Sequence, residues 1–332
     1  MLTLEKLRAI TTGALEVWEE DGYFHFCRYT HRHFEAIGQF HLWRYDYQTK
    51  LDLDERCRAA SGIRLEFTTC GGTLSFDYRV DFGASHTRHN LEITVDGTGM
   101  YHICKEELPA SGSVLFEIPK KDVPQRVTVY CSDLTVFCIK NLSLPADYAP
   151  VQRPLKYLAL GDSITQGSIA DHPNQTYTNL LADMLDAEVV NHAIGGVQFN
   201  PAYVDKNLPF RPDIITCSYG VNDWNGCHFM GYTQYQEFLD KITATHPPAK
   251  IFLLIPVWAS IEETETRDGY TLEQVRQRIE ALAAQYPAIT VIDARRFIPH
   301  LADCFAEDNL HPNDLGFLHM AYHIYNAMKP YL

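Results

Sequence analysis

The spacing of hydrophobic residues divides the chain into two parts with different predicted secondary structure. Between about residues 23 and 143, short runs of hydrophobic residues are separated by turn residues, and no convincing helical spacing interrupts them. Within 73–80 every second residue is hydrophobic, which is typical of a strand with one buried face. This part therefore predicts an antiparallel β-sandwich or jelly roll. The runs that predict strands are 23–29, 63–68, 74–80, 91–95, 114–118, 126–131 and 135–142.

After residue 154 the pattern changes to strands that alternate with helices. Hydrophobic residues at helical spacing separate the strand-like runs, and a capping box from Thr271 to Gln274 and a cap at Asn313 predict two helix starts. Alternating strands and helices indicate an α/β domain, in which helices cover both faces of a parallel sheet. The strand-like runs are 157–160, 189–193, 213–219, 251–257 and 288–292.

The boundary between the two parts is predicted from proline content and length. Three prolines fall within residues 145–154, which favours a linker over a helix or a central strand. A chain of 332 residues is also longer than one compact core usually holds. We therefore expect a β-sandwich domain at 1–148 and an α/β domain at 154–332.

Charge and cysteine content exclude several classes of protein. The formal net charge of −14 argues against a nucleic-acid partner and against sustained binding to anionic lipid. Hydrophobic runs are too short for a membrane span or a signal peptide, which predicts a cytoplasmic protein without membrane attachment. Nine cysteines occur singly and form no CxxC pair, so free, mostly buried thiols are expected.

Candidate chemistry lies just after the predicted strands, at the carboxyl edge where parallel sheets carry their sites. Ser163 follows the strand at 157–160, and a serine becomes nucleophilic only when a base takes its proton. Gly195 and Gly196 follow the next strand, where a glycine N–H can hold an oxyanion. Taken singly, each residue is equally compatible with a helix cap or an ordinary loop.

Two further segments supply the remaining groups that acyl transfer needs. Asn222, after the strand at 213–219, carries an amide N–H₂ that can donate to an oxyanion. Asp308 and His311 are three residues apart before the last predicted helix, so the carboxylate can orient one ring nitrogen while the other faces a serine. A turn residue and a surface loop remain the simpler interpretations of these two segments alone.

Other titratable residues offer rival sites. His319 and His323 have the i, i+4 spacing of a helical metal site, but we expect them on the solvated face of the last helix. His31 and His33 would share a face if their segment is a strand, yet no further ligand accompanies them. Asp293 is a weaker alternative to Asp308 as the partner of the base.

The four segments together resemble a known family. GDSIT, the glycine after the second strand, GVND and DNLHP are similar to blocks I, II, III and V of the SGNH (GDSL-like) hydrolases, over residues 154–332. The resemblance implies a three-layer, flavodoxin-like domain without metal or cofactor. It implies Ser163 as nucleophile, His311 as base and Asp308 as its orienting acid. The implied oxyanion donors are Ser163, Gly196 and Asn222, with Gly195 as the alternative glycine.

The substrate follows from the order of the two predicted domains. A β-sandwich before an SGNH domain resembles the two-domain carbohydrate acetylesterases, which implies O-acetyl groups on plant-type saccharides such as xylan or mannan. A general short-chain acyl-ester or lysophospholipid hydrolase is the alternative among enzymes. A carbohydrate-binding protein with an inactive hydrolase domain is the alternative from another class. The sequence leaves the oligomeric state open.

Overall fold

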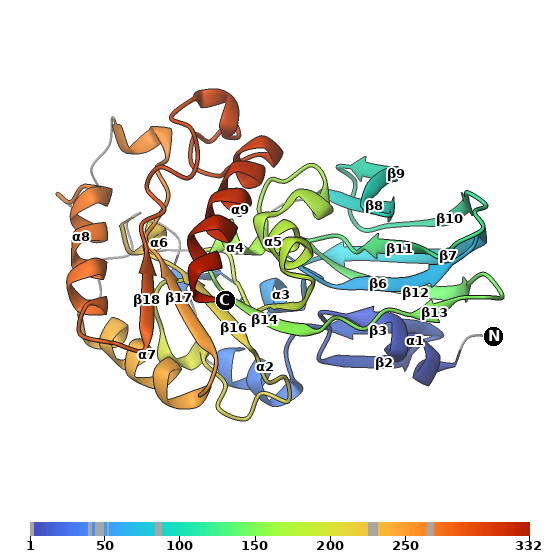
Figure 1. Ribbon diagram of the computed structural model, residues 1–332, viewed down its shortest axis with the longest axis horizontal. Helices are drawn as coiled ribbons and strands as arrows, with labels where there is room; N and C mark the ends of the chain where they lie inside the picture. Colours follow the sequence, from blue (N-terminus) through green and yellow to red (C-terminus); the bar gives the residue numbers. More distant parts are fainter. Residues whose placement is uncertain are drawn as a thin grey trace.

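The computed structural model describes residues 3–38, 42–43, 50–51, 53–83, 88–224, 232–263 and 269–332. Antiparallel sheets occupy one end of the molecule and a parallel sheet with its helices occupies the other (Figure 1). Helix α1 (Leu4–Ile10) lies beside the antiparallel sheets. Among the described helices, none has the length and apolar character needed to cross a bilayer.

The antiparallel part consists of two packed sheets, as predicted. Their facing sides share one core of buried residues from both sheets. The alternation within β7 places Leu74, Phe76, Tyr78 and Val80 in this core, because successive side chains of a strand point to opposite faces. The first sheet has the order β1 (Thr11–Thr12), β6 (Arg64–Thr69), β11 (Gln125–Tyr130), β8 (His89–Val95), β9 (Thr98–Lys105), with β13 (Ala149–Pro150) also beside β6. The second has the order β10 (Ala110–Ile118), β7 (Gly72–Phe82), β12 (Thr135–Ser143), β3 (Tyr23–Cys27), β2 (Glu16–Glu20).

The expectation that no helix interrupts this part is wrong. Helices α2 (His31–Gly38) and α3 (Leu53–Arg58) follow β3, and a short pair of strands, β4 (Leu42–Trp43) and β5 (Lys50–Leu51), lies between them in sequence. Ile37, Leu53 and Cys57 are buried in the same cluster as residues of the parallel sheet. These helices therefore pack on the α/β part, and α3 also contacts β12 of the sandwich.

The second part is a five-stranded parallel sheet with helices on both faces. Its strand order, β15-β14-β16-β17-β18, is the flavodoxin-like order 2-1-3-4-5, which confirms the predicted fold class. Helices α5 and α9 pack on one face, whereas α7 and α8 pack on the other. The strands are β14 (Leu155–Gly161), β15 (Ala187–Asn191), β16 (Ile214–Ser218), β17 (Lys250–Leu254) and β18 (Ile289–Ile292). The helices are α4 (Ser163–Gln166), α5 (Tyr177–Leu185), α6 (Val221–Trp224), α7 (Tyr232–Thr245), α8 (Leu272–Ala283) and α9 (Asp314–Met328).

Local signals in the sequence mark the helix starts correctly. Thr271 and Gln274 form the predicted capping box of α8. Asn313 caps α9 by accepting a hydrogen bond from the Gly316 N–H. The described cysteines are free thiols and most are buried, as expected, while Cys227 lies outside the described residues.

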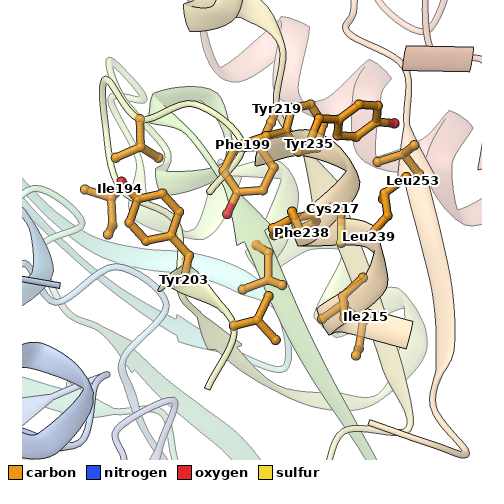
Figure 2. Close-up of a cluster of buried hydrophobic side chains, with 14 of the residues drawn as sticks. Ile194, Phe199, Tyr203, Ile215, Cys217, Tyr219, Tyr235, Phe238, Leu239 and Leu253 are labelled. Atoms are coloured by element: carbon orange, nitrogen blue, oxygen red, sulfur yellow. The ribbon is translucent and has the colours of Figure 1, made fainter. Parts of the chain in front are cut away.

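A cluster of buried aromatic rings supports the loop after β15. Figure 2 shows Phe199 among Tyr219, Tyr235 and Phe238, with ring centroids 5.0, 4.1 and 5.4 Å away respectively. Ile194 and Phe199 are at most 3% exposed. A close-packed anchor of this kind fixes the path of the loop between them.

Candidate active site

Ser163 lies at the carboxyl end of the central strand β14, on the first residue of α4. Asp162 caps this short helix, since its Oδ1 accepts a hydrogen bond of 3.1 Å from the Ile164 N–H. Gly161 allows the sharp turn, because a Cβ there would overlap Thr165 Oγ1 and the Ser218 carbonyl. The turn leaves Ser163 half-buried at the edge of the sheet.

Ser163, His311 and Asp308 form one hydrogen-bonded chain. His311 Nε2 lies 2.7 Å from Ser163 Oγ, and His311 Nδ1 lies 2.5 Å from Asp308 Oδ2. Oδ1 of Asp308 accepts two further hydrogen bonds of 3.0 Å, from the N–H groups of Leu310 and His311. Partial burial of Asp308 raises its pKa, but the hydrogen bonds and charge of His311 outweigh burial and lower that pKa to about 2. The carboxylate is thus charged at neutral pH, where it can hold the imidazole in one tautomer.

The loop after β15 brings backbone donors beside Ser163. A Cβ built on Gly195 would lie 3.5 Å from the Cβ of Ser163. The Gly195 N–H already donates to Gln166 Oε1 at 2.6 Å. Gly196 has a φ of +86° in the turn that the Val197 N–H closes onto the Ile194 carbonyl at 3.4 Å. Of the two glycines considered, Gly196 therefore has the available N–H.

Asn222 lies in α6, immediately beyond β16, and is buried. Its Nδ2 donates to the Val197 carbonyl at 3.1 Å, and its own carbonyl accepts a hydrogen bond of 3.2 Å from Gln198 Nε2. An amide nitrogen carries two hydrogens, so one N–H remains for a ligand. The two contacts tie the side chain and the backbone of Asn222 to the loop that carries Gly196.

Two buried arginines from the first part of the chain hold this loop, and sequence reasoning missed both. Arg28 is 0% exposed and donates hydrogen bonds of 2.5 and 2.6 Å to the carbonyls of Asn191 and Ala193. It also donates to the carbonyls of Ala59 and Arg56. Arg56 Nη1 donates to the Gly195 carbonyl at 2.5 Å. The described contacts therefore connect the N-terminal part of the chain to the loop beside Ser163.

The rival residues lie in other environments. Asp293 forms an ion pair of 2.9 Å with Arg295. His319 and His323 stack with ring centroids 6.5 Å apart, away from the buried stripe of α9. His31 and His33 belong to helix α2, so the interpretation of their segment as a strand is wrong.

Comparisons with known proteins identify a family for the second part of the chain. Residues 159–317 match the GDSL-like Lipase/Acylhydrolase family, a range that contains Ser163, Asn222, Asp308 and His311. A search of curated proteins finds no match. The matched residues form a GDSL-like hydrolase domain, and this match supports acyl-ester hydrolysis as the class of reaction.

Solved structures share the fold over most of the chain, at low sequence identity. The salicylyl-acyltransferase SsfX3 from a tetracycline biosynthetic pathway is 18% identical, with a TM-score of 0.75 over 97% of this chain and 94% of that one. A family two carbohydrate esterase from Clostridium thermocellum, in complex with cellohexaose, is 14% identical, with a TM-score of 0.60 over 82% and 93%. The acetyl xylan esterase Est2A from the rumen bacterium Butyrivibrio proteoclasticus is 15% identical, with a TM-score of 0.57 over 82% and 91%.

Proposed function

We propose that this protein, whose residues 159–317 form a GDSL-like hydrolase domain, is a serine esterase that removes O-acetyl groups from oligo- or polysaccharides of the xylan and mannan type. The observation that carries the proposal is the hydrogen-bonded chain from Asp308 through His311 to Ser163. A purely binding role would give no reason for this chain to lie beside three candidate oxyanion donors, which are the N–H groups of Ser163 and Gly196 and the side chain of Asn222.

The first half of the reaction forms an acyl-enzyme. Neutral His311 accepts the proton of Ser163 Oγ as this oxygen attacks the ester carbonyl. Negative charge develops on the carbonyl oxygen, and the N–H groups of Ser163 and Gly196 and the side chain of Asn222 donate to it. The C–O bond to the sugar then breaks, and the leaving alkoxide takes the proton from the His311 imidazolium.

The second half returns the enzyme to its starting state. His311 takes a proton from a water molecule, whose oxygen attacks the acyl carbonyl. The bond to Ser163 Oγ breaks, and the imidazolium returns the proton to this oxygen. Acetic acid leaves, and Asp308 remains a carboxylate throughout because its pKa is held at about 2.

The substrate class is inferred from the fold. Est2A, an acetyl xylan esterase, and the family two carbohydrate esterase in complex with cellohexaose each share the fold over 82% of this chain. SsfX3 is an acyltransferase, and it matches a larger share of this chain than the two esterases do. The assays therefore test transfer of the acyl group to an alcohol as well as hydrolysis.

The test compares acyl donors and acceptors in one set of assays. Acetate release from acetylated xylo- and manno-oligosaccharides is expected to exceed release from p-nitrophenyl esters of longer acyl chains. Preference for long acyl chains or for lysophospholipid would contradict the saccharide assignment. Faster acyl transfer to an added alcohol than to water would contradict hydrolysis as the main reaction.

Arg56→Met is expected to lower kcat by between about tenfold and 100-fold while KM changes little. The variant loses the hydrogen bond to the Gly195 carbonyl, which holds the glycine turn in place. The expected loss in kcat approaches the loss caused by removing one oxyanion donor, because the Gly196 N–H is less well placed when the turn is not held. Steady-state kinetics with an acetyl ester measure both constants.

Arg58→Met is the matched control, because Arg58 lies on the same helix and stacks over Phe34 at 4.9 Å. It is expected to retain the wild-type kcat, and Arg56→Lys is expected to recover part of the loss. Equal kcat for the wild type and Arg56→Met would show that Arg56 does not position the glycine turn for catalysis.

A further inference from the structure

A cluster of metal-ligating side chains lies where the sandwich meets the α/β part. Strands β8 and β9 pair in antiparallel register with Glu92 opposite His102, so both side chains project from the same face of the sheet. His172 approaches from the segment before α5, which packs against β8. One carboxylate oxygen of Glu92 and one ring nitrogen of each histidine all lie within 4.8 Å of one another.

Glu92 is the least expected member of this cluster. It is 3% exposed, and its Oε2 has no hydrogen-bond partner among the described residues. The carboxylate lines a cavity of about 580 Å³ together with His102 and His172. A Cβ on Gly99 would come within 2.5 Å of Glu92 Oε1, so a glycine there leaves room for the carboxylate. A buried carboxylate without a partner is costly, and a bound cation would offset that cost.

The rings of His102 and His172 stack with centroids 3.9 Å apart and planes 23° from parallel, so a rotation of the rings must accompany their binding to one ion. Each ring has one nitrogen already engaged. His172 Nδ1 lies 2.8 Å from Asp314 Oδ2, and His102 Nε2 lies 3.1 Å from the Asp171 carbonyl. In a neutral ring these contacts place the proton on the engaged nitrogen, which leaves Nε2 of His172 and Nδ1 of His102 as lone-pair donors. Metal-ligating histidines in proteins are oriented in this way, by a carboxylate or a carbonyl behind the ring.

We propose that Glu92, His102 and His172 bind a zinc ion, with Asp314 orienting His172. Two imidazoles and one carboxylate are ligands that zinc accepts, and water can complete a four-coordinate site.

The ion would link three elements that are distant in sequence. Glu92 and His102 belong to the sandwich, His172 precedes α5, and Asp314 is the first residue of α9. Asp314 Oδ1 also accepts a hydrogen bond of 2.9 Å from the Asp171 N–H. Because none of these residues belongs to the Ser163 site, we expect the zinc to stabilise the junction and to supply no chemistry to ester cleavage.

The test measures zinc uptake by the full chain after treatment with a chelator. Equilibrium dialysis against Zn²⁺ is expected to give one tightly bound equivalent, and an excess of about a hundredfold over Kd is expected to raise Tm by several degrees. Glu92→Gln is expected to abolish both effects. Asp314→Asn is expected to weaken binding by roughly 10- to 100-fold, the usual cost of losing the partner behind a histidine ligand.

The matched control is the double variant His319→Ala/His323→Ala, which removes the solvated histidine pair of α9. This variant is expected to bind one equivalent of Zn²⁺, as the wild type does, and to show the same rise in Tm. Absence of tight uptake by the wild type would overturn the proposal, as would uptake that survives Glu92→Gln. Loss of zinc uptake in the control would place the ion on α9, and this result would also overturn the proposal. Esterase activity of Glu92→Gln shows independently that the variant is folded.

Discussion

Ser163→Ala is expected to lower kcat for acetyl esters by about 10⁴-fold or more while leaving the fold intact. The serine Oγ lies 2.7 Å from His311 Nε2, so the base has a proton to take only when this hydroxyl is present. Without it no acyl-enzyme forms, and only slow attack by water beside the oxyanion donors remains. Initial rates with p-nitrophenyl acetate measure the loss.

Ser168→Ala is the matched control for this prediction. Ser168 is a buried serine of the same segment, and its N–H donates to the Ser163 carbonyl at 3.0 Å through the backbone, which the substitution keeps. It is expected to retain most of the wild-type rate. Wild-type turnover by Ser163→Ala would refute the role of Ser163.

Asp308→Asn is expected to lower kcat by roughly 10³- to 10⁴-fold. The carboxylate Oδ2 accepts the proton of His311 Nδ1, which keeps Nε2 unprotonated and ready to act as base. An asparagine can present its N–H₂ to Nδ1 and so favour the tautomer that carries its proton on Nε2. The backbone contacts of Oδ1 can persist, so the loss is expected in kcat with little change in thermal stability.

Asp293→Asn is the matched control, because Asp293 is the carboxylate considered as an alternative partner of the base. Its side chain pairs with Arg295 and is 61% exposed. Its replacement is expected to leave kcat close to that of the wild type. The opposite ranking of the two variants would mean that Asp308 is not the residue that orients His311.

Much of the fold could be predicted because local patterns agree with the tertiary structure. Hydrophobic and polar residues alternate in β7 because one face of this strand lies in the sandwich core. The cap at Asn313 marks the start of α9. The parallel sheet could be predicted because its strands alternate with amphipathic helices. Helices α2 and α3 could not, since they are short and sit among strand-like runs. Burial of Ile37 and Cys57 against the parallel sheet gives these helices their tertiary support.

The candidate catalytic residues were proposed from motifs, whereas the two arginines that contact the loop beside Ser163 were not. Ser163 and His311 lie within short segments whose order along the chain is informative. Arg28 and Arg56 reach carbonyls more than a hundred residues away, and no local spacing indicates such contacts. Glu92, His102 and His172 are likewise separated in sequence, so no metal-binding motif marks them.

Covalent labelling of the nucleophile tests the central claim most directly. The protein is incubated with a fluorophosphonate, and the adduct is located by intact-mass and peptide mass spectrometry. We predict one adduct per chain on the peptide that contains Ser163, loss of esterase activity in proportion to labelling, and no adduct on Ser163→Ala. An adduct that maps to another residue, or full esterase activity in the labelled protein, would contradict the account.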